Sequence, residues 1–200
     1  MASGNMKVIK RRIKSVESTM QITKAMELVA SSKLRKAKEK ADKARPYFNA
    51  LYDTMCEIEA ENPKFLSPFT RKSGEGKSLL IIIAGDRGLA GGFNNNIFKL
   101  AQARIDELGG IDKVDILPIG KKAVEYYEKR GYNLMAQYQN ICESIRIVEA
   151  EEIAESIVAP YIKGVYEREE LFYTEYVSPI TQTAVSKQLL PVEFKTERKK

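Results

Sequence analysis

The sequence predicts an α/β protein with a long coiled-coil-type helix at its N-terminus and a small Rossmann-like parallel α/β domain after it. Two observations predict this fold. Residues 7–45 contain no proline or glycine, are rich in strong helix formers, and repeat apolar residues at spacings of three and four. From residue 79 onward, short apolar runs alternate with helical stretches, which is typical of parallel sheets. We therefore expect a shaft helix over 1–59, a linker over 60–78, an α/β domain over 79–195 and a charged tail over 196–200.

The helix has an apolar seam that extends over most of its length. Its first track is Ile9, Ile13, Val16 and Met20, and its second is Ala30, Leu34, Ala37, Ala41, Ala44, Phe48, Leu51, Met55 and Ile58. Such a seam has to face another helix. Fifty residues at about 1.5 Å each make a rod of about 75 Å, too long to bury its seam on the remaining residues. Pro46 lies inside the second track, where we expect a kink or a restart.

Between the two tracks the apolar surface widens to include Ile22, Ala25, Met26 and Val29. This belt covers more than one helical stripe, as expected for a helix that is enclosed on several sides. A local contact with the chain's own domain explains the pattern equally well.

The positive charge of the chain is concentrated on this helix. Residues 7–45 carry 13 basic and four acidic side chains, whereas the whole chain has a net charge of only +6. The asymmetry predicts an acidic partner for the helix. Nucleic acid is a less suitable partner, because no aromatic side chain that could stack on bases interrupts the charges before Tyr47.

The second part of the chain predicts alternating strands and helices. We expect strands at 79–84, 114–120, 170–178 and, as an edge strand containing Pro191, 188–195, with a weaker one near 133–138. The predicted helices are 95–108, 121–131 and 150–170, the last bent or restarted at Pro160.

Composition excludes several kinds of active site. The chain has no histidine, so zinc sites built on histidine, Ser-His-Asp triads and Cys-His dyads are excluded. Its two cysteines, Cys56 and Cys142, have no metal-ligand spacing. No apolar run reaches about 18 residues, and the N-terminus lacks the apolar core of a secretory signal, so we expect a cytoplasmic chain with no membrane insertion.

Two glycine-rich motifs suggest nucleotide binding, and neither satisfies the pattern. GEGKS at 74–78 has Arg71 where a phosphate loop needs glycine, and it precedes a strand instead of following one. GDRGLAGGFN at 85–94 follows a strand and opens a helix, but its glycines do not form G-x-G-x-x-G and Asp86 would repel phosphate. We expect a tight turn that packs helix on strand, with no cofactor and no metal.

Two segments together resemble a known family. IKRRIKSVESTMQITKAMELVASSKLRKAK at 9–38 is similar to the N-terminal shaft helix of F-type ATP synthase gamma subunits, and GDRGLAGGFNNNIF at 85–98 is similar to that family's glycine turn. QLLP at 188–191 fits as well. Ala90 stands where the family often has cysteine, and the cysteine pair of the redox-regulated plastid form has no counterpart. The family's second long helix, which winds antiparallel around the first, is absent before Lys200.

The resemblance implies a mechanical function and no catalytic site. It implies a rotor shaft that turns inside the alpha and beta subunits, with the α/β domain contacting the epsilon subunit and the membrane c-ring. It would lie at the cytoplasmic face of the membrane as a peripheral part of the complex. The residues we expect to contact partners are Met20, Lys24, Met26, Val29, Lys33, Arg35 and Lys36. A nucleotide-using α/β enzyme and a nucleic-acid-binding basic helix remain the alternatives.

Overall fold

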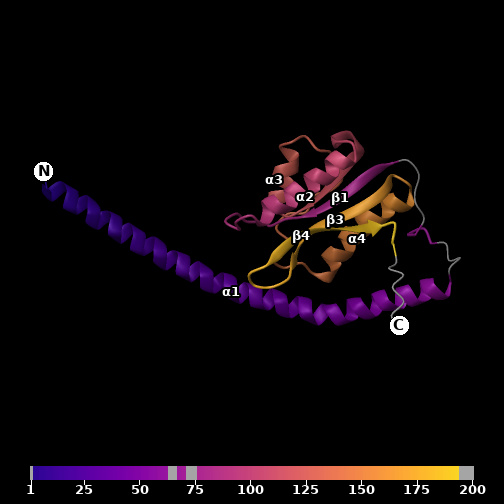
Figure 1. Cartoon of the computed structure of the whole chain (residues 1–200), viewed down its shortest axis with the longest axis horizontal. Helices are drawn as coiled ribbons and strands as arrows, with labels where there is room; N and C mark the ends of the chain where they lie inside the picture. Colours follow the sequence, from indigo (N-terminus) through magenta and orange to yellow (C-terminus); the bar gives the residue numbers. More distant parts are fainter. Residues whose placement is uncertain (1, 63–66, 71–75, 194–200) are drawn as a thin grey trace. The chain divides into compact units, whose positions relative to one another are not determined.

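The computed structural model describes residues 2–62, 67–70 and 76–193 and divides them into two compact units. The first unit is a single helix, α1 (Ala2–Glu61), whose 60 residues continue through Pro46 without a restart (Figure 1). The long N-terminal helix is therefore confirmed. The predicted charged tail at 196–200, the linker residues 63–66 and 71–75, and the first two residues of GEGKS lie outside the described residues.

The second unit contains a four-stranded sheet with the order β2-β1-β3-β4. Strand β1 (Lys77–Ile83) lies between β2 (Val114–Ile119) and β3 (Tyr166–Tyr176) and is parallel to both. Strand β4 (Gln182–Leu190) pairs with β3 antiparallel and forms the edge. The connection from β3 to β4 is far too short for a crossover, so this last pair has to be antiparallel.

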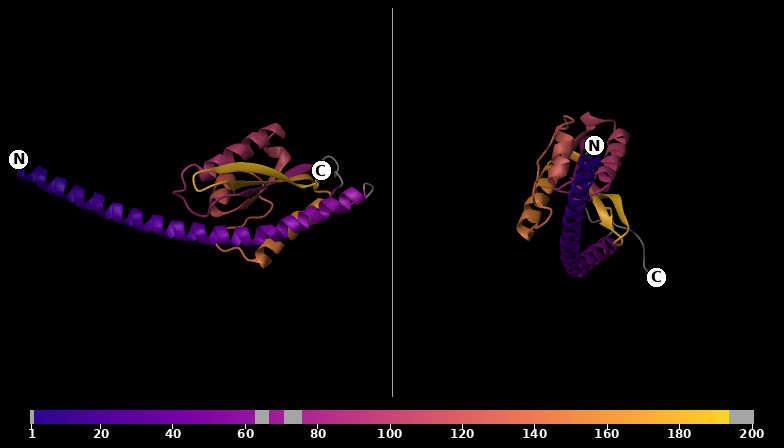
Figure 2. Two further views of the ribbon diagram at one scale, coloured as in Figure 1. Left: turned by 60° about the horizontal axis from the view of Figure 1, so that its bottom comes forward. Right: turned by 90° about the vertical axis from the view of Figure 1, so that its left-hand side faces the viewer.

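Helices cover both faces of the sheet (Figure 1, Figure 2). Helices α2 (Phe93–Glu107) and α3 (Lys121–Glu128) pack on one face, and α4 (Ile147–Ile162) packs on the other. A short 3-10 helix, η1 (Ile111–Lys113), precedes β2. Alternate residues of β1 serve the two cores, with Leu80 and Ile82 facing α2 and α3 and Leu79 and Ile81 facing α4. Burial on both faces explains why β1 is apolar without interruption.

Most predicted elements are found with bounds that differ by a few residues, and three segments differ more. The helix predicted over 150–170 ends at Ile162, because Gly164 has φ +74 and closes it, and β3 then begins at Tyr166. The last strand is 182–190 instead of 188–195, and residues 194–195 lie outside the described part of the chain. The weak strand near 133–138 consists of two isolated parallel bridges to β2, at Leu134 and Tyr138.

Candidate functional site

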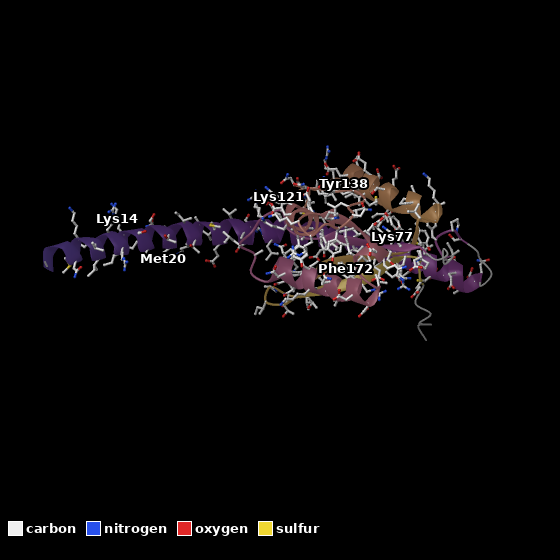
Figure 3. All side chains as sticks on the ribbon, turned by 90° about the horizontal axis from the view of Figure 1, so that it is seen from above. Lys14, Met20, Lys77, Lys121, Tyr138 and Phe172 are labelled. Carbon is white, nitrogen blue, oxygen red and sulfur yellow. The ribbon has the colours of Figure 1, made fainter. Side chains whose placement is uncertain are left out.

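The seven residues predicted to contact partners all lie on α1, and all are exposed. The exposed fractions of the apolar ones are 63% for Met20, 52% for Met26 and 58% for Val29. Figure 3 shows the side chain of Met20 on this helix, as well as that of Lys14.

These residues form two groups on opposite sides of the helix. At about 100° per residue, Met26, Val29, Lys33 and Lys36 fall within about 80° of one another. By the same geometry Met20, Lys24 and Arg35 fall within about 60° of one another on the opposite side. Sequence reasoning treated the seven as one bearing surface. The helix separates them, so a partner that contacts all seven has to surround α1.

The apolar seam of α1 is exposed over its whole length. Exposed fractions along it are 51% for Ile9, 52% for Ile13, 47% for Leu34, 63% for Phe48 and 48% for Ile58. Contiguous apolar patches of more than a few hundred Å² mark interaction sites in soluble proteins. The seam therefore marks an interaction surface for a partner of matching length.

The basic side chains of α1 far outnumber its acidic ones over residues 7–45, 13 to four. One exposed salt bridge on α1 joins Arg35 to Glu39, with 3.9 Å between Nε and Oε1. Both side chains are more than half exposed, so this pair contributes at most about 1 kcal/mol. The excess of basic side chains over 7–45 thus gives α1 a positive field along its length.

The glycine-rich turn at 85–92 is the alternative candidate site, and its Asp86 is fully engaged by backbone. Oδ1 of Asp86 accepts the N–H groups of Lys121 and Asn140, each at 2.8 Å, and Oδ2 accepts that of Cys142 at 3.2 Å. Burial by itself would raise the pKa of Asp86, but these amides hold it below its ordinary value. The carboxylate faces amides that would otherwise be available to an external anion.

The cavities beside this turn do not suit a nucleotide. The cavity at the N-terminus of α2, next to Thr174, has about 170 Å³, below the usual range of about 300–1,000 Å³ for small-molecule sites. The cavity between the turn and α3 has about 360 Å³. Both faces of the Tyr126 ring in it are covered, by Phe98 at 4.1 Å and by the guanidinium of Arg130 at 3.5 Å, so no base can stack there.

Other reactive side chains have structural partners. Lys77, the lysine of the GEGKS motif, begins β1 and places its Nζ 2.9 Å from Oδ1 of Asp115. The Cys142 thiol donates to the Ala84 carbonyl at 3.3 Å, and burial together with the Asp86 carboxylate raises its pKa to about 11. A thiol with that pKa is a poor nucleophile at neutral pH.

Metal and membrane sites are not found in the described part of the chain. In residues 2–62, 67–70 and 76–193, no three acidic or cysteine side chains gather where they could hold a metal ion. Within the same ranges, no helix combines the length and the apolar character needed to cross a bilayer.

Sequence reasoning missed the groups that join distant parts of the α/β unit. Glu170 on β3 is bound by Arg104 of α2, with 2.6 Å between Nη2 and Oε1 and 2.9 Å between Nε and Oε2. The contacts of Asp86 reach residues 35, 54 and 56 positions away. No local pattern carries a signal for such pairs.

Comparison with known proteins identifies close relatives. A family model described as ATP synthase matches residues 5–200. The ATP synthase gamma chain of Ruminococcus albus is 51% identical over 193 residues, which cover 95% of this chain and 66% of that protein. The gamma chain of Desulforamulus reducens is 38% identical and covers 96% and 67%. The sodium ion specific gamma chain of Acetobacterium woodii is 38% identical and covers 94% and 61%.

The fold is also found in a solved structure. The central stalk of Tetrahymena thermophila mitochondrial ATP synthase, solved with its c-ring, superposes with a TM-score of 0.68 at 23% identity. The match covers 85% of this chain and 72% of that one. At this identity the match supports the fold alone. The chain spans about two thirds of the length of the curated relatives it matches.

Proposed function

The chain belongs to the ATP synthase family and, within it, to the gamma chains, and from this premise we propose that it is the central rotor stalk of an F-type ATP synthase. In this role it carries torque between an ion-driven ring in the membrane and the catalytic head, and it catalyses no reaction itself. The observation that carries the proposal is α1, a 60-residue positively charged helix whose apolar seam is exposed from end to end.

The two units take different parts of this function. α1 (Ala2–Glu61) would form the shaft, and the elements from Lys77 to Leu190 would form the α/β block, so the predicted linker over 60–78 shortens to 62–76. The partners of the shaft are the alpha and beta subunits and a second helix from the remaining third of the gamma-chain length. The partners of the block are the epsilon subunit and the c-ring, which would place the chain at the cytoplasmic face of the membrane as a peripheral component.

The two opposite groups of residues on α1 fit a shaft that is surrounded. One side of the surrounding alpha and beta subunits would contact Met26, Val29, Lys33 and Lys36. The opposite side would contact Met20, Lys24 and Arg35. Each exposed ion pair with an acidic loop contributes only about 0–1 kcal/mol. Contacts this weak can be exchanged as the shaft turns past equivalent partners.

Assembly tests the proposal. The chain, extended by the last third of a gamma chain such as that of Ruminococcus albus, is co-expressed with alpha and beta subunits and purified through a tag on beta. We expect a stable complex that contains this chain and hydrolyses ATP. Failure of the chain to co-purify with folded alpha and beta subunits would contradict the proposal.

Charge reversal tests the shaft surface. The triple variant Lys33→Glu, Arg35→Glu and Lys36→Glu should weaken the coupling of ATP hydrolysis to ion pumping while the α/β unit stays folded. The matched control reverses three exposed lysines of the α/β unit, Lys99, Lys113 and Lys129. Equal loss of coupling in both triple variants would show that the effect is one of net charge and not of the shaft.

A further inference from the structure

At the carboxyl edge of the parallel sheet, one carboxylate accepts hydrogen bonds from two distant segments of the chain. Strand β1 leads into Asp86, β2 leads through Gly120 into α3, and the segment after Tyr138 passes beside them. Asp86 accepts one N–H from the first residue of α3 and two from the segment that contains Asn140 and Cys142. Three segments that are distant in sequence therefore meet at a single side chain.

Two residues beside the Asp86 carboxylate, Gly120 and Asn140, have positive φ angles. Gly120 has φ +98, and a Cβ there would come within 2.0 Å of the Ala84 carbonyl oxygen. Asn140 has φ +60, in the left-handed region that non-glycine residues seldom adopt. Such a conformation is costly for a residue with a Cβ, such as Asn140, and persists where the surroundings determine it. The two donors of the shortest bonds to Asp86, Lys121 and Asn140, are at or directly after these positions.

Other contacts also join these segments, two between backbone groups and one between exposed charged side chains. The Lys122 N–H donates to the Gly85 carbonyl at 3.0 Å, and the Gly120 N–H donates to the Tyr138 carbonyl at 2.7 Å. Nε of Arg87 lies 3.3 Å from Oε1 of Glu143, but the two side chains are 76% and 47% exposed, so this pair holds the segments only weakly. The Asp86 carboxylate is the charged group that accepts backbone N–H groups here, and hydrogen bonds to a charged group are the stronger kind.

We propose that Asp86 is a positioning residue: its ionised carboxylate fixes the glycine turn 85–92, the start of α3 and the segment 138–142 as one rigid block. The turn carries Leu89 at its tip, 96% exposed and with φ +61, so Asp86 sets where this apolar side chain is presented. The relevance of that rigidity to torque rests on the function proposed above, because a block that yields cannot transmit a load. The hydrogen bonds of Asp86, called the lock below, form within the chain and do not depend on partner subunits.

The direct test is amide hydrogen exchange in Asp86→Ala, measured on the whole chain by NMR. Exchange at Lys121, Asn140 and Cys142 should become about tenfold faster or more, while the buried amides of β1 stay protected. Asp112→Ala, which removes an exposed carboxylate on η1, is the matched control and should change none of these rates. Unchanged exchange at all three amides in Asp86→Ala would overturn the proposal.

Chemical rescue separates a charged lock from simple packing. Sodium formate should restore protection at the three amides of Asp86→Ala, and sodium chloride at equal ionic strength should not. If formate acts no better than chloride, the carboxylate is not the positioning group. If Asp86→Ala does not fold, Asp86→Asn serves instead, because its single side-chain oxygen can replace Oδ1 but not Oδ2. In Asp86→Asn, exchange should become faster at the Cys142 amide and stay slow at Lys121 and Asn140. Slow exchange at all three amides in this variant would contradict the proposal.

Acid provides an independent readout. The pKa of Asp86 is lowered despite burial, because the three amides favour the charged form. Protection at Lys121, Asn140 and Cys142 should therefore persist above the ordinary aspartate pKa and be lost as pH falls through the lowered one. These readouts do not need the assembled complex, so their failure would leave the proposed function standing, and a failure of assembly would leave the lock standing.

Discussion

Glu169 should make the α/β unit less stable as pH rises, and replacing it with glutamine should remove that loss. The side chain is fully buried on β3, facing the α4 core, where Tyr161 and Tyr166 are nearby. Within the described residues, neither carboxylate oxygen has a hydrogen-bond partner. Burial without a partner disfavours the charged form and raises the pKa of Glu169 to about 8.

The magnitude follows from linkage between protonation and folding. The folded-state pKa is raised from the ordinary 4.5, so the stability is complete below pH 4.5 and is lost as pH rises toward 8. A shift to about 8 corresponds to a loss of about 3 kcal/mol at pH 7 and about 5 kcal/mol well above pH 8. Glu169→Gln carries no charge, so its advantage over the wild type should grow from near zero at pH 4 to about 3 kcal/mol at pH 7.

Urea denaturation at a series of pH values measures this difference. Tyrosine fluorescence is a suitable signal, because eight of the ten tyrosines lie in the α/β unit. Glu175→Gln, an exposed position on the same strand, is the control and should follow the wild type. Parallel stability curves for wild type and Glu169→Gln between pH 4 and pH 8 would refute the reasoning, since they would mean that the ionised carboxylate finds a partner.

Three further predictions concern stability and ligand binding. Gly120→Ala should lower the free energy of unfolding by about 3 kcal/mol or more, because φ is +98 and the new Cβ would overlap the Ala84 carbonyl. Gly131→Ala, where φ is +74 but the space around the glycine is open, should lower it by about 1–2 kcal/mol in the same denaturation assay. Arg104→Ala should cost about 3 kcal/mol, because it leaves the buried Glu170 carboxylate with only the longer contact to Arg168 at 3.5 Å, and the double variant Arg104→Met with Glu170→Leu should recover most of that loss. Calorimetric titration of the chain with ATP should give no saturable binding in the micromolar range, and such binding at the glycine turn would support the enzyme alternative instead.

The sequence predicted the elements that local composition determines. Helix α1 was predictable because its helix formers and its three-and-four spacing extend over many turns, and β1 because burial on both faces requires a continuous apolar run. The start of β3 was not predictable from local pattern. Its Glu169 and Glu170 look like the exposed end of a helix. The burial of Glu170 depends mainly on Arg104, 66 positions away, whose hydrogen bonds to it are shorter than the 3.5 Å contact from Arg168.

The candidate site was predictable in part, because local pattern identifies exposed residues but not the groups that they contact. Sequence pattern placed seven exposed residues on one helix, and helical geometry then separated them into two opposite groups. It could not show which partner meets which group, since that depends on other chains. Asp86 was interpreted as a charge that would repel phosphate, whereas its carboxylate is an acceptor for three backbone amides from two distant segments.

Rotation of the chain relative to the catalytic head tests the central claim most directly. In the complex formed with alpha and beta subunits, beta is fixed to a surface and a visible probe is attached to the α/β unit. We expect the probe to turn in one direction when ATP is added and to stop when ATP is removed. A probe that stays still while the same complexes hydrolyse ATP would contradict the claim that α1 is a turning shaft.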